Sequence, residues 1–249
     1  MATARTGGKA EASVDPEARR PACTPAAAAR AGGEEGREDA VGDRGITLVL
    51  GGASSGKSEV AERIAAAAGG PVTYVATGPV PGIAAAKDVP TTPGADDERA
   101  RADWQADWEA DWEARVARHR ARRPPHWRTV ELPQGGDLGA ALRAVAGVAL
   151  VDSLGTWLAG LPGFGEEEGL SRLADALRWR EAAGLATVVV SEEVGLGVHP
   201  ATTAGIAFRE AMGRLNGRIG ELAGDVLLVV AGRVLPLPRF DRFADPGAP

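Results

Sequence analysis

The chain has 249 residues, of which 44% are hydrophobic, and a formal net charge of -6 at pH 7. This composition is typical of a globular protein, and the negative charge argues against a general affinity for nucleic acid, whose binding proteins carry a basic face. No apolar run approaches the roughly 20 residues that a membrane-spanning helix needs, and no secretory signal is recognisable. We therefore expect a cytoplasmic protein with no nucleic-acid partner and no membrane span.

Three regions follow from the distribution of residue types. Residues 1–44 mix Ala, Gly, Arg, Glu and Pro without hydrophobic periodicity, which predicts a disordered N-terminal extension. The single cysteine, Cys23, lies in this extension and cannot form an internal disulfide, so nothing indicates an oxidising compartment. Residues 45–239 are predicted to form one domain, and residues 240–249 a flexible tail.

The first predicted elements are a strand over 46–50, a glycine-rich loop and a helix over 57–68. The loop, 51–58, reads GGASSGKS, which is the Walker A pattern. Its glycines let backbone amides face phosphate groups, Lys57 neutralises phosphate oxygens, and Ser58 offers a hydroxyl to magnesium. Because a strand precedes the loop and a helix follows it, we predict a binding site for a nucleoside triphosphate.

A second strand is predicted over 72–76, followed by a long loop over 79–100 and a helix over 98–123. An Ala-Asp-Trp tetrad occurs three times in this helix, at Trp104, Trp108 and Trp112. Residues four apart advance by about 40° around a helix, so the three indoles share one inclined stripe. We interpret the stripe as a surface that packs on the domain or on a neighbouring subunit, in preference to a ligand-stacking surface.

The remaining chain alternates between strand and helix patterns. Strands are predicted over 128–132, 148–152, 186–191, 225–230 and 234–235, and helices over 138–146, 168–183 and 203–223. This alternation predicts a mainly parallel sheet covered on both faces. The last connection is too short to cross over, so the final strand is an antiparallel hairpin partner. The predicted fold class is a P-loop NTPase-like, three-layer α/β domain with a C-terminal antiparallel hairpin.

Two residues outside the loop are candidates for the chemistry. Asp152 closes the apolar strand 148–152, where a carboxylate can hold the magnesium water shell of a bound nucleotide. His119 lies among five arginines within 115–123, which is consistent with a solvated basic helix face. The same arginines disfavour the imidazolium and attract polyphosphate, which makes histidine attack on phosphorus chemically reasonable. The residues by themselves leave both interpretations of His119 open.

Taken together, these segments resemble the bifunctional adenosylcobinamide kinase / adenosylcobinamide-phosphate guanylyltransferase family of cobalamin biosynthesis. The resemblance covers roughly residues 46–237. Its motifs, in chain order, are GGASSGKS at 51–58, YVAT at 74–77, RVxxHRxxRP at 115–124 with Trp127, TVE at 129–131, LVDSLxxWL at 150–158, VSxEVGxG at 190–197, FRExxGxxN at 208–216 and AxDVxLVVAG at 223–232.

The resemblance implies two reactions: phosphorylation of the cobinamide side-chain hydroxyl, then transfer of GMP from GTP onto that phosphate. By this analogy His119 attacks the α-phosphate and becomes guanylylated, while Lys57 and Mg²⁺ stabilise the departing pyrophosphate. It also implies GTP as substrate, with ATP as a second candidate for the kinase step, and a homo-oligomer, with a trimer as candidate. The implied catalytic residues are His119 and Lys57, the metal-binding residues are Ser58 and Asp152, and the nucleotide-binding residues are Gly51, Gly52, Ala53, Ser54, Ser55, Gly56, Lys57, Ser58, Ala76, Thr77, Gly78, Arg120, Arg123, Glu131 and Asp152.

Three features depart from the family pattern. Residues 79–110 contain a proline-rich insertion and the tryptophan repeat, where the family has a short acidic link. Glu192 stands where the family usually has Asn, and Gly155 where a bulkier residue is common. Two other functions stay open: a P-loop kinase for small molecules without a covalent intermediate, and a GTP-responsive module whose tryptophan stripe recruits another protein.

Overall fold

The computed structural model describes residues 45–79, 98–165 and 167–239, apart from the side chains of 98–106 and Trp108. The predicted extension 1–44, the predicted tail 240–249 and most of the predicted loop 79–100 lie outside the described residues. Within them, seven strands form one sheet with the order β3-β2-β4-β5-β1-β6-β7. The strands are β1 Ile46–Gly51, β2 Val72–Ala76, β3 Arg128–Glu131, β4 Val148–Asp152, β5 Thr187–Glu192, β6 Asp225–Val230 and β7 Arg233–Pro236.

The pairing of the strands confirms the predicted fold class. All neighbouring strands are parallel except β6 and β7, which form the predicted antiparallel hairpin. Parallel pairing brings the carboxyl ends of β1, β2, β4 and β5 to one edge of the sheet, where ligands bind in open α/β folds. The phosphate loop after β1 and Asp152 at the end of β4 therefore lie at the same edge.

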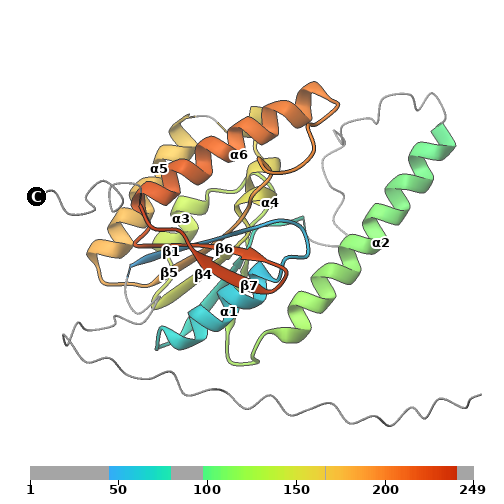
Figure 1. Ribbon diagram of the computed structural model, residues 1–249. Helices are drawn as coiled ribbons and strands as arrows, with labels where there is room; N and C mark the ends of the chain where they lie inside the picture. The colour runs from blue at the N-terminus through green and yellow to red at the C-terminus, as the bar shows by residue number, and fades with distance from the viewer. Residues whose placement is uncertain (1–44, 80–97, 166, 240–249) are drawn as a thin grey trace, which may run out of the picture. The chain divides into compact units, whose positions relative to one another are not determined.

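Helices cover both faces of the sheet, as Figure 1 shows for α3, α4, α5 and α6 on one face and α1 on the other. Sequence patterns predicted each described α-helix except α4. Ser153 and Thr156 form a capping box at the start of α4, and Leu154, Trp157 and Leu158 form its buried face. The helices are α1 Lys57–Ala67, α2 Glu98–Arg122, α3 Leu138–Arg143, α4 Leu154–Ala159, α5 Glu167–Ala182 and α6 Thr203–Leu222, and a short 3-10 helix spans Pro162–Phe164. Among the described residues, no helix has the length and apolar character needed to cross a membrane.

Two apolar clusters, one on each face, hold the layers together. In β1, Ile46, Leu48 and Leu50 belong to the cluster beneath α3, α4, α5 and α6. Val49 points the other way, into the cluster that contains Ala61 and Ala65 of α1. Every residue of β1 is buried, as expected for a central parallel strand with both faces covered. This central position gives the phosphate loop a rigid base.

The side chain of Arg180 on α5 is fully buried beneath the sheet. Its guanidinium donates to the hydroxyl of Thr187 and to four backbone carbonyls, those of Leu142, Val145, Gly147 and Ala186. None of these acceptors is a carboxylate. Burial lowers the pKa of Arg180 to about 10, so the group still carries its charge at neutral pH. The cation thus joins α5 to the chain segments that enter β4 and β5.

We predict that Arg180→Met lowers the free energy of unfolding by about 2–5 kcal/mol, because buried carbonyls lose their donors. The loss is measured by urea unfolding. Arg178→Met is the matched control, since Arg178 lies on the same helix, is 55% exposed and forms a surface ion pair with Asp175. Equal stability of the two variants would contradict this role of Arg180.

Candidate active site

The phosphate loop is closely packed against the start of α1. A Cβ atom on Gly51 would lie 2.5 Å from Oγ of Ser55, so this position requires glycine. Gly56 adopts a left-handed φ of 94° directly before α1, which turns the chain into the helix. Lys57 folds back over the loop, and its Nζ donates to the carbonyl of Gly52 at 3.2 Å. The loop therefore has the close backbone and the inward lysine that phosphate binding needs.

A polar cavity above this loop, which we call the loop cavity, joins it to α2. Residues Ser54–Glu59 line one side of the cavity. The other side is contributed by five residues of α2: Asp111, Arg115, Arg118, His119 and Arg122. Oγ of Ser55 is buried there and has no hydrogen-bond partner within the described structure. Three arginines and one histidine thus face the phosphate loop across the cavity, which favours a polyphosphate as its ligand.

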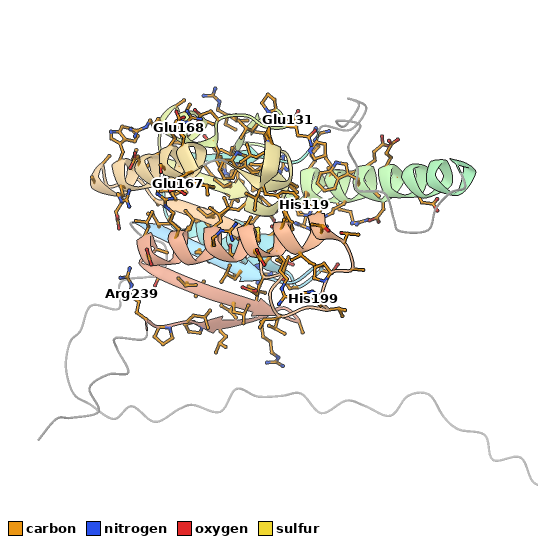
Figure 2. The ribbon with its side chains drawn as sticks, turned by 90° about the horizontal axis from the view of Figure 1, so that it is seen from above. His119, Glu131, Glu167, Glu168, His199 and Arg239 are labelled. Carbon is orange, nitrogen blue, oxygen red and sulfur yellow. The ribbon has the colours of Figure 1, made fainter. Side chains whose placement is uncertain are left out.

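His119 lies near the end of α2 that leads to β3 (Figure 2), and contacts between α2 and the rest of the domain fix its position. Arg122 donates to both carboxylate oxygens of Glu62 on α1, at 3.2 and 3.3 Å. Arg123 lies over the ring of Tyr74, with its guanidinium carbon 3.5 Å from the ring centroid. Nδ1 of His119 is 3.3 Å from Oδ2 of Asp152. The structure thus brings together the predicted histidine, the predicted aspartate and the phosphate loop.

Asp152 has a dense shell of hydrogen-bond donors. The hydroxyl of Tyr74 donates to its Oδ2 at 2.5 Å. Burial by itself raises the pKa of Asp152, but hydrogen bonds from His119 and Tyr74 and the proximity of His119 lower it, and Ser58 adds to this. The net pKa lies below the usual value, so the carboxylate is ionised. Burial and the neighbouring Asp152 charge raise the pKa of Tyr74, which stays a neutral donor.

A second cavity, which we call the Trp112 cavity, lies on the other side of His119. His119 and Arg115 line both cavities. The rest of the lining combines apolar and aromatic residues with polar and charged ones: Tyr74, Ala76, Gly78, Pro79, Trp112 and Val116, and Arg120, Arg123, Glu131, Asp152, Ser153 and Thr156. Nε of Arg123 is buried there without a hydrogen-bond partner in the described structure. A mixed wall of this kind suits a ligand with both a ring and polar groups.

The other residues predicted from the sequence take different places around this cavity. Ala76 and Gly78 line it, whereas the Thr77 side chain points inward and bonds to the carbonyl of Ser153 at 2.6 Å. Thr77 therefore holds the end of β2 against α4. Glu131 forms an ion pair with Arg120 at the cavity rim, and both side chains are partly exposed.

Trp112 lies at the wall of the same cavity. Its Nε1 donates to the carbonyl of Pro79 at 2.9 Å, and its indole leaves no room for a Cβ atom on Gly78. Trp112 therefore packs against the domain, as predicted for the tryptophan stripe, and its indole also faces a cavity. The side chains of Trp104 and Trp108 lie outside the described residues.

Sequence reasoning assigned no role to Tyr74 or Glu62, and it interpreted Trp112 as part of a packing surface rather than as part of a cavity wall. Tyr74 is the single tyrosine of the chain and stands in an otherwise aliphatic buried strand, which was a usable signal. Glu62 is a carboxylate on the buried side of α1, and only its partner on α2 explains it.

The sequence matches the family described as cobinamide kinase / cobinamide phosphate guanyltransferase over residues 47–87 and 100–237. The chain belongs to this family. The match includes the phosphate loop, His119 and Asp152, so the residues that meet in the structure are inside the cobinamide kinase / guanyltransferase region. The unmatched residues 88–99 interrupt the match and lie within the predicted insertion.

Curated relatives agree with this assignment. The chain is 36% identical over 196 residues to the bifunctional adenosylcobalamin biosynthesis protein CobP of Pseudomonas aeruginosa, covering 76% of this chain and 95% of that protein. It is 29% identical over 203 residues to the bifunctional protein CobU of Escherichia coli, covering 75% and 96%. Among solved structures, the flagellar accessory protein FlaH of Methanocaldococcus jannaschii is 13% identical, covers 76% of this chain and 74% of its own, and has a TM-score of 0.40.

We predict that Tyr74→Phe destabilises the protein by about 1.5–3 kcal/mol at neutral pH, because an ionised carboxylate loses a donor. The folded-state pKa of Asp152 is lowered, so its ionised form contributes stability above the unfolded-state pKa of about 3.9, and this contribution is lost as the pH falls through the folded-state pKa. The difference between wild type and variant should therefore narrow below about pH 4. Urea unfolding between pH 3 and 8 measures it, and a pH-independent difference would contradict the assignment.

Proposed function

We propose that this chain phosphorylates the side-chain hydroxyl of adenosylcobinamide and then transfers GMP from GTP to the new phosphate, with His119 as the carrier of the guanylyl group. Both reactions are those for which its family is named. The observation that supports the carrier role is the position of His119 in the wall shared by the loop cavity and the Trp112 cavity. A group bound to this side chain has access to both.

The hydrogen bonding of His119 supports nucleophilic attack by Nε2. Nδ1 lies 3.3 Å from the ionised Asp152 and 3.4 Å from Nη2 of Arg122; the carboxylate contact is the shorter of the two and favours the tautomer in which Nδ1 carries the proton. Nε2 then keeps its lone pair, and Asp152 stabilises the positive charge that develops on the ring. A bond forms between Nε2 and the α-phosphorus while the bond to pyrophosphate breaks. In the second transfer a phosphate oxygen of the acceptor attacks the same phosphorus, and the P–N bond breaks.

The phosphate loop and α2 supply the electrostatic part of the proposal. Lys57 and the loop amides hold the β- and γ-phosphates, and the arginines of α2 face them across the loop cavity. Arg123 has a buried Nε that lacks a partner in the described structure and that can donate to the nucleotide. Gly51 to Ser58, Ala76 to Gly78, Arg120 and Glu131 complete the proposed nucleotide contacts.

Ser58 and Asp152 fit a magnesium site. Hydrogen bonding by Ser58 contributes to the lowered pKa of Asp152, so a hydroxyl and an ionised carboxylate face the same small space beside the phosphate loop. Few protein ligands and several phosphate oxygens are the usual Mg²⁺ environment in such enzymes. When bound, Mg²⁺ offsets phosphate charge and favours departure of the leaving group.

The family assignment also supports GTP as the guanylyl donor, GTP or ATP as the phosphoryl donor, and a homo-oligomeric, cytoplasmic enzyme. These features rest on the family assignment and not on the contacts of the active site. The P-loop kinase without a covalent intermediate remains the competing function, and it differs from the proposal in having no use for the His119–Asp152 pair.

We predict that His119→Ala abolishes covalent labelling by GTP carrying ³²P at the α-phosphate, because of the two described side chains that line both cavities, His119 and Arg115, only the histidine is a nucleophile. Guanylyl transfer should fall by at least about 10³-fold, as expected when a covalent nucleophile is removed, while GTP binding persists. The wild-type label should be acid-labile and base-stable. His126→Ala is the matched control, since His126 is exposed and lines neither cavity. Unchanged turnover of His119→Ala would exclude the guanylyl-histidine.

A further inference from the structure

Glu192 lies at the carboxyl edge of the sheet and has no role in either proposed reaction as described so far. It is the last residue of β5, the strand that lies between β1 and β4, and it pairs in register with Gly51. Its carboxylate is therefore placed between the phosphate loop and the chain segment that follows Asp152. Oε1 lies 3.7 Å from Nζ of Lys57.

The carboxylate of Glu192 is held from two sides. Oε1 accepts from the hydroxyl of Ser153 at 2.8 Å, and Oε2 accepts from the backbone N–H of Gly155 at 2.9 Å. A Cβ atom on Gly155 would collide with Oε2. The two departures from the family pattern, Glu at 192 and Gly at 155, are thus one structural feature: a longer side chain and the space that admits it.

The contact with Lys57 places Glu192 at the γ-phosphate end of the site. The lysine of a phosphate loop contacts the β- and γ-phosphates, so a carboxylate 3.7 Å from its Nζ lies beside the γ-phosphate position. Among the described residues, the linings of the two cavities that share His119 do not include Glu192. Its side chain is 22% exposed, so a substrate group can reach it.

The two reactions differ in their need for a base. In phosphoryl transfer the acceptor is an alcohol, whose proton has to leave as the oxygen bonds to phosphorus. In guanylyl transfer the acceptor is a phosphate monoester, which is already largely ionised at neutral pH because its second pKa is about 6. A carboxylate base beside the γ-phosphate, like the aspartate of protein kinases, therefore serves only the first reaction.

We propose that Glu192 is the general base of the phosphoryl-transfer half-reaction, an inference that rests on the proposed function. Lys57 turns from Glu192 to the bound phosphates, which frees a lone pair on Oε1 for the acceptor hydroxyl. The hydroxyl oxygen bonds to the γ-phosphorus, the bond from this phosphorus to the β–γ bridging oxygen breaks, and the nucleoside diphosphate leaves. The hydroxyl proton passes to the Glu192 carboxylate and then to solvent. Ser153 and Gly155 keep the carboxylate oriented.

The test compares the two half-reactions in Glu192→Gln, which keeps the size of the side chain; its amide oxygen can still accept from the N–H of Gly155, and its NH2 group can donate to the Ser153 hydroxyl. Phosphorylation of adenosylcobinamide should fall about 10²–10⁴-fold in kcat, the usual contribution of a general base, and its acidic pH limb should disappear. Guanylyl transfer from GTP to supplied adenosylcobinamide phosphate should stay within about threefold. Glu168→Gln is the matched control, because Glu168 is an exposed residue of α5 that pairs with Arg172.

Gly155→Ala provides an independent variant. The backbone φ of Gly155 is not in the positive range, so alanine is compatible with α4, and only the position of the Glu192 carboxylate is disturbed. We expect the same selective loss of phosphorylation, and little further loss when this change is added to Glu192→Gln. Thermal unfolding verifies that each variant folds.

The possible outcomes separate the inference from the proposed function. Parallel losses in both half-reactions would show that Glu192 acts through Lys57, and unchanged phosphorylation would show that it is not a base; either result overturns the inference while the proposed function stands. A wild-type protein that performs neither reaction overturns both.

Discussion

The attachment of the last turn of α2 to the domain is the constraint on which the rest of the active site depends. Two consecutive arginines make this attachment in different ways: Arg122 pairs with Glu62 on α1, and Arg123 covers the ring of Tyr74 on β2. His119 lies one helical turn before them and reaches Asp152. Together with the contacts of Trp112 and Arg120, these contacts fix the register of α2 against the sheet and so define the position of the histidine relative to the phosphate loop.

The same contacts explain how so much charge is accommodated beside a buried edge of the sheet. Asp152 is buried, and its ionised form is stabilised by donors from three different elements. Lys57 is almost fully buried, and its ammonium group donates to the carbonyl of Gly52 and forms an ion pair with Glu192. Each buried charge thus has a partner that a substrate or metal can replace or supplement, which is what a site for a highly charged ligand requires.

Local sequence patterns predicted much of this arrangement. The loop 51–58 was recognisable because its function needs backbone geometry, and Asp152 because a strand end has a known place in a parallel sheet. His119 was ambiguous from its neighbours alone, since a basic helix face and a phosphate-binding face have the same composition. The contact with Asp152, a residue 33 positions further along the chain, is the observation that favours the phosphate-binding interpretation.

Other parts could not be predicted for physical reasons. Tyr74 and Asp152 are 78 residues apart in sequence and meet only because β2 and β4 are neighbours in the sheet. The order of the strands depends on packing between layers, and no short motif records it. The start of α4 is defined by a capping box at Ser153, directly after the end of β4, so no loop separates the two elements in the sequence.

The close fit of Glu192 to Gly155 also couples the residues that these two positions tolerate. With any larger residue at 155, a glutamate at 192 would have no room for its present conformation, whereas glycine at 155 is compatible with shorter side chains at 192. A side chain at 155 is therefore tolerated only when residue 192 is smaller or turns away. The effects of substitutions at the two positions are thus expected to be non-additive.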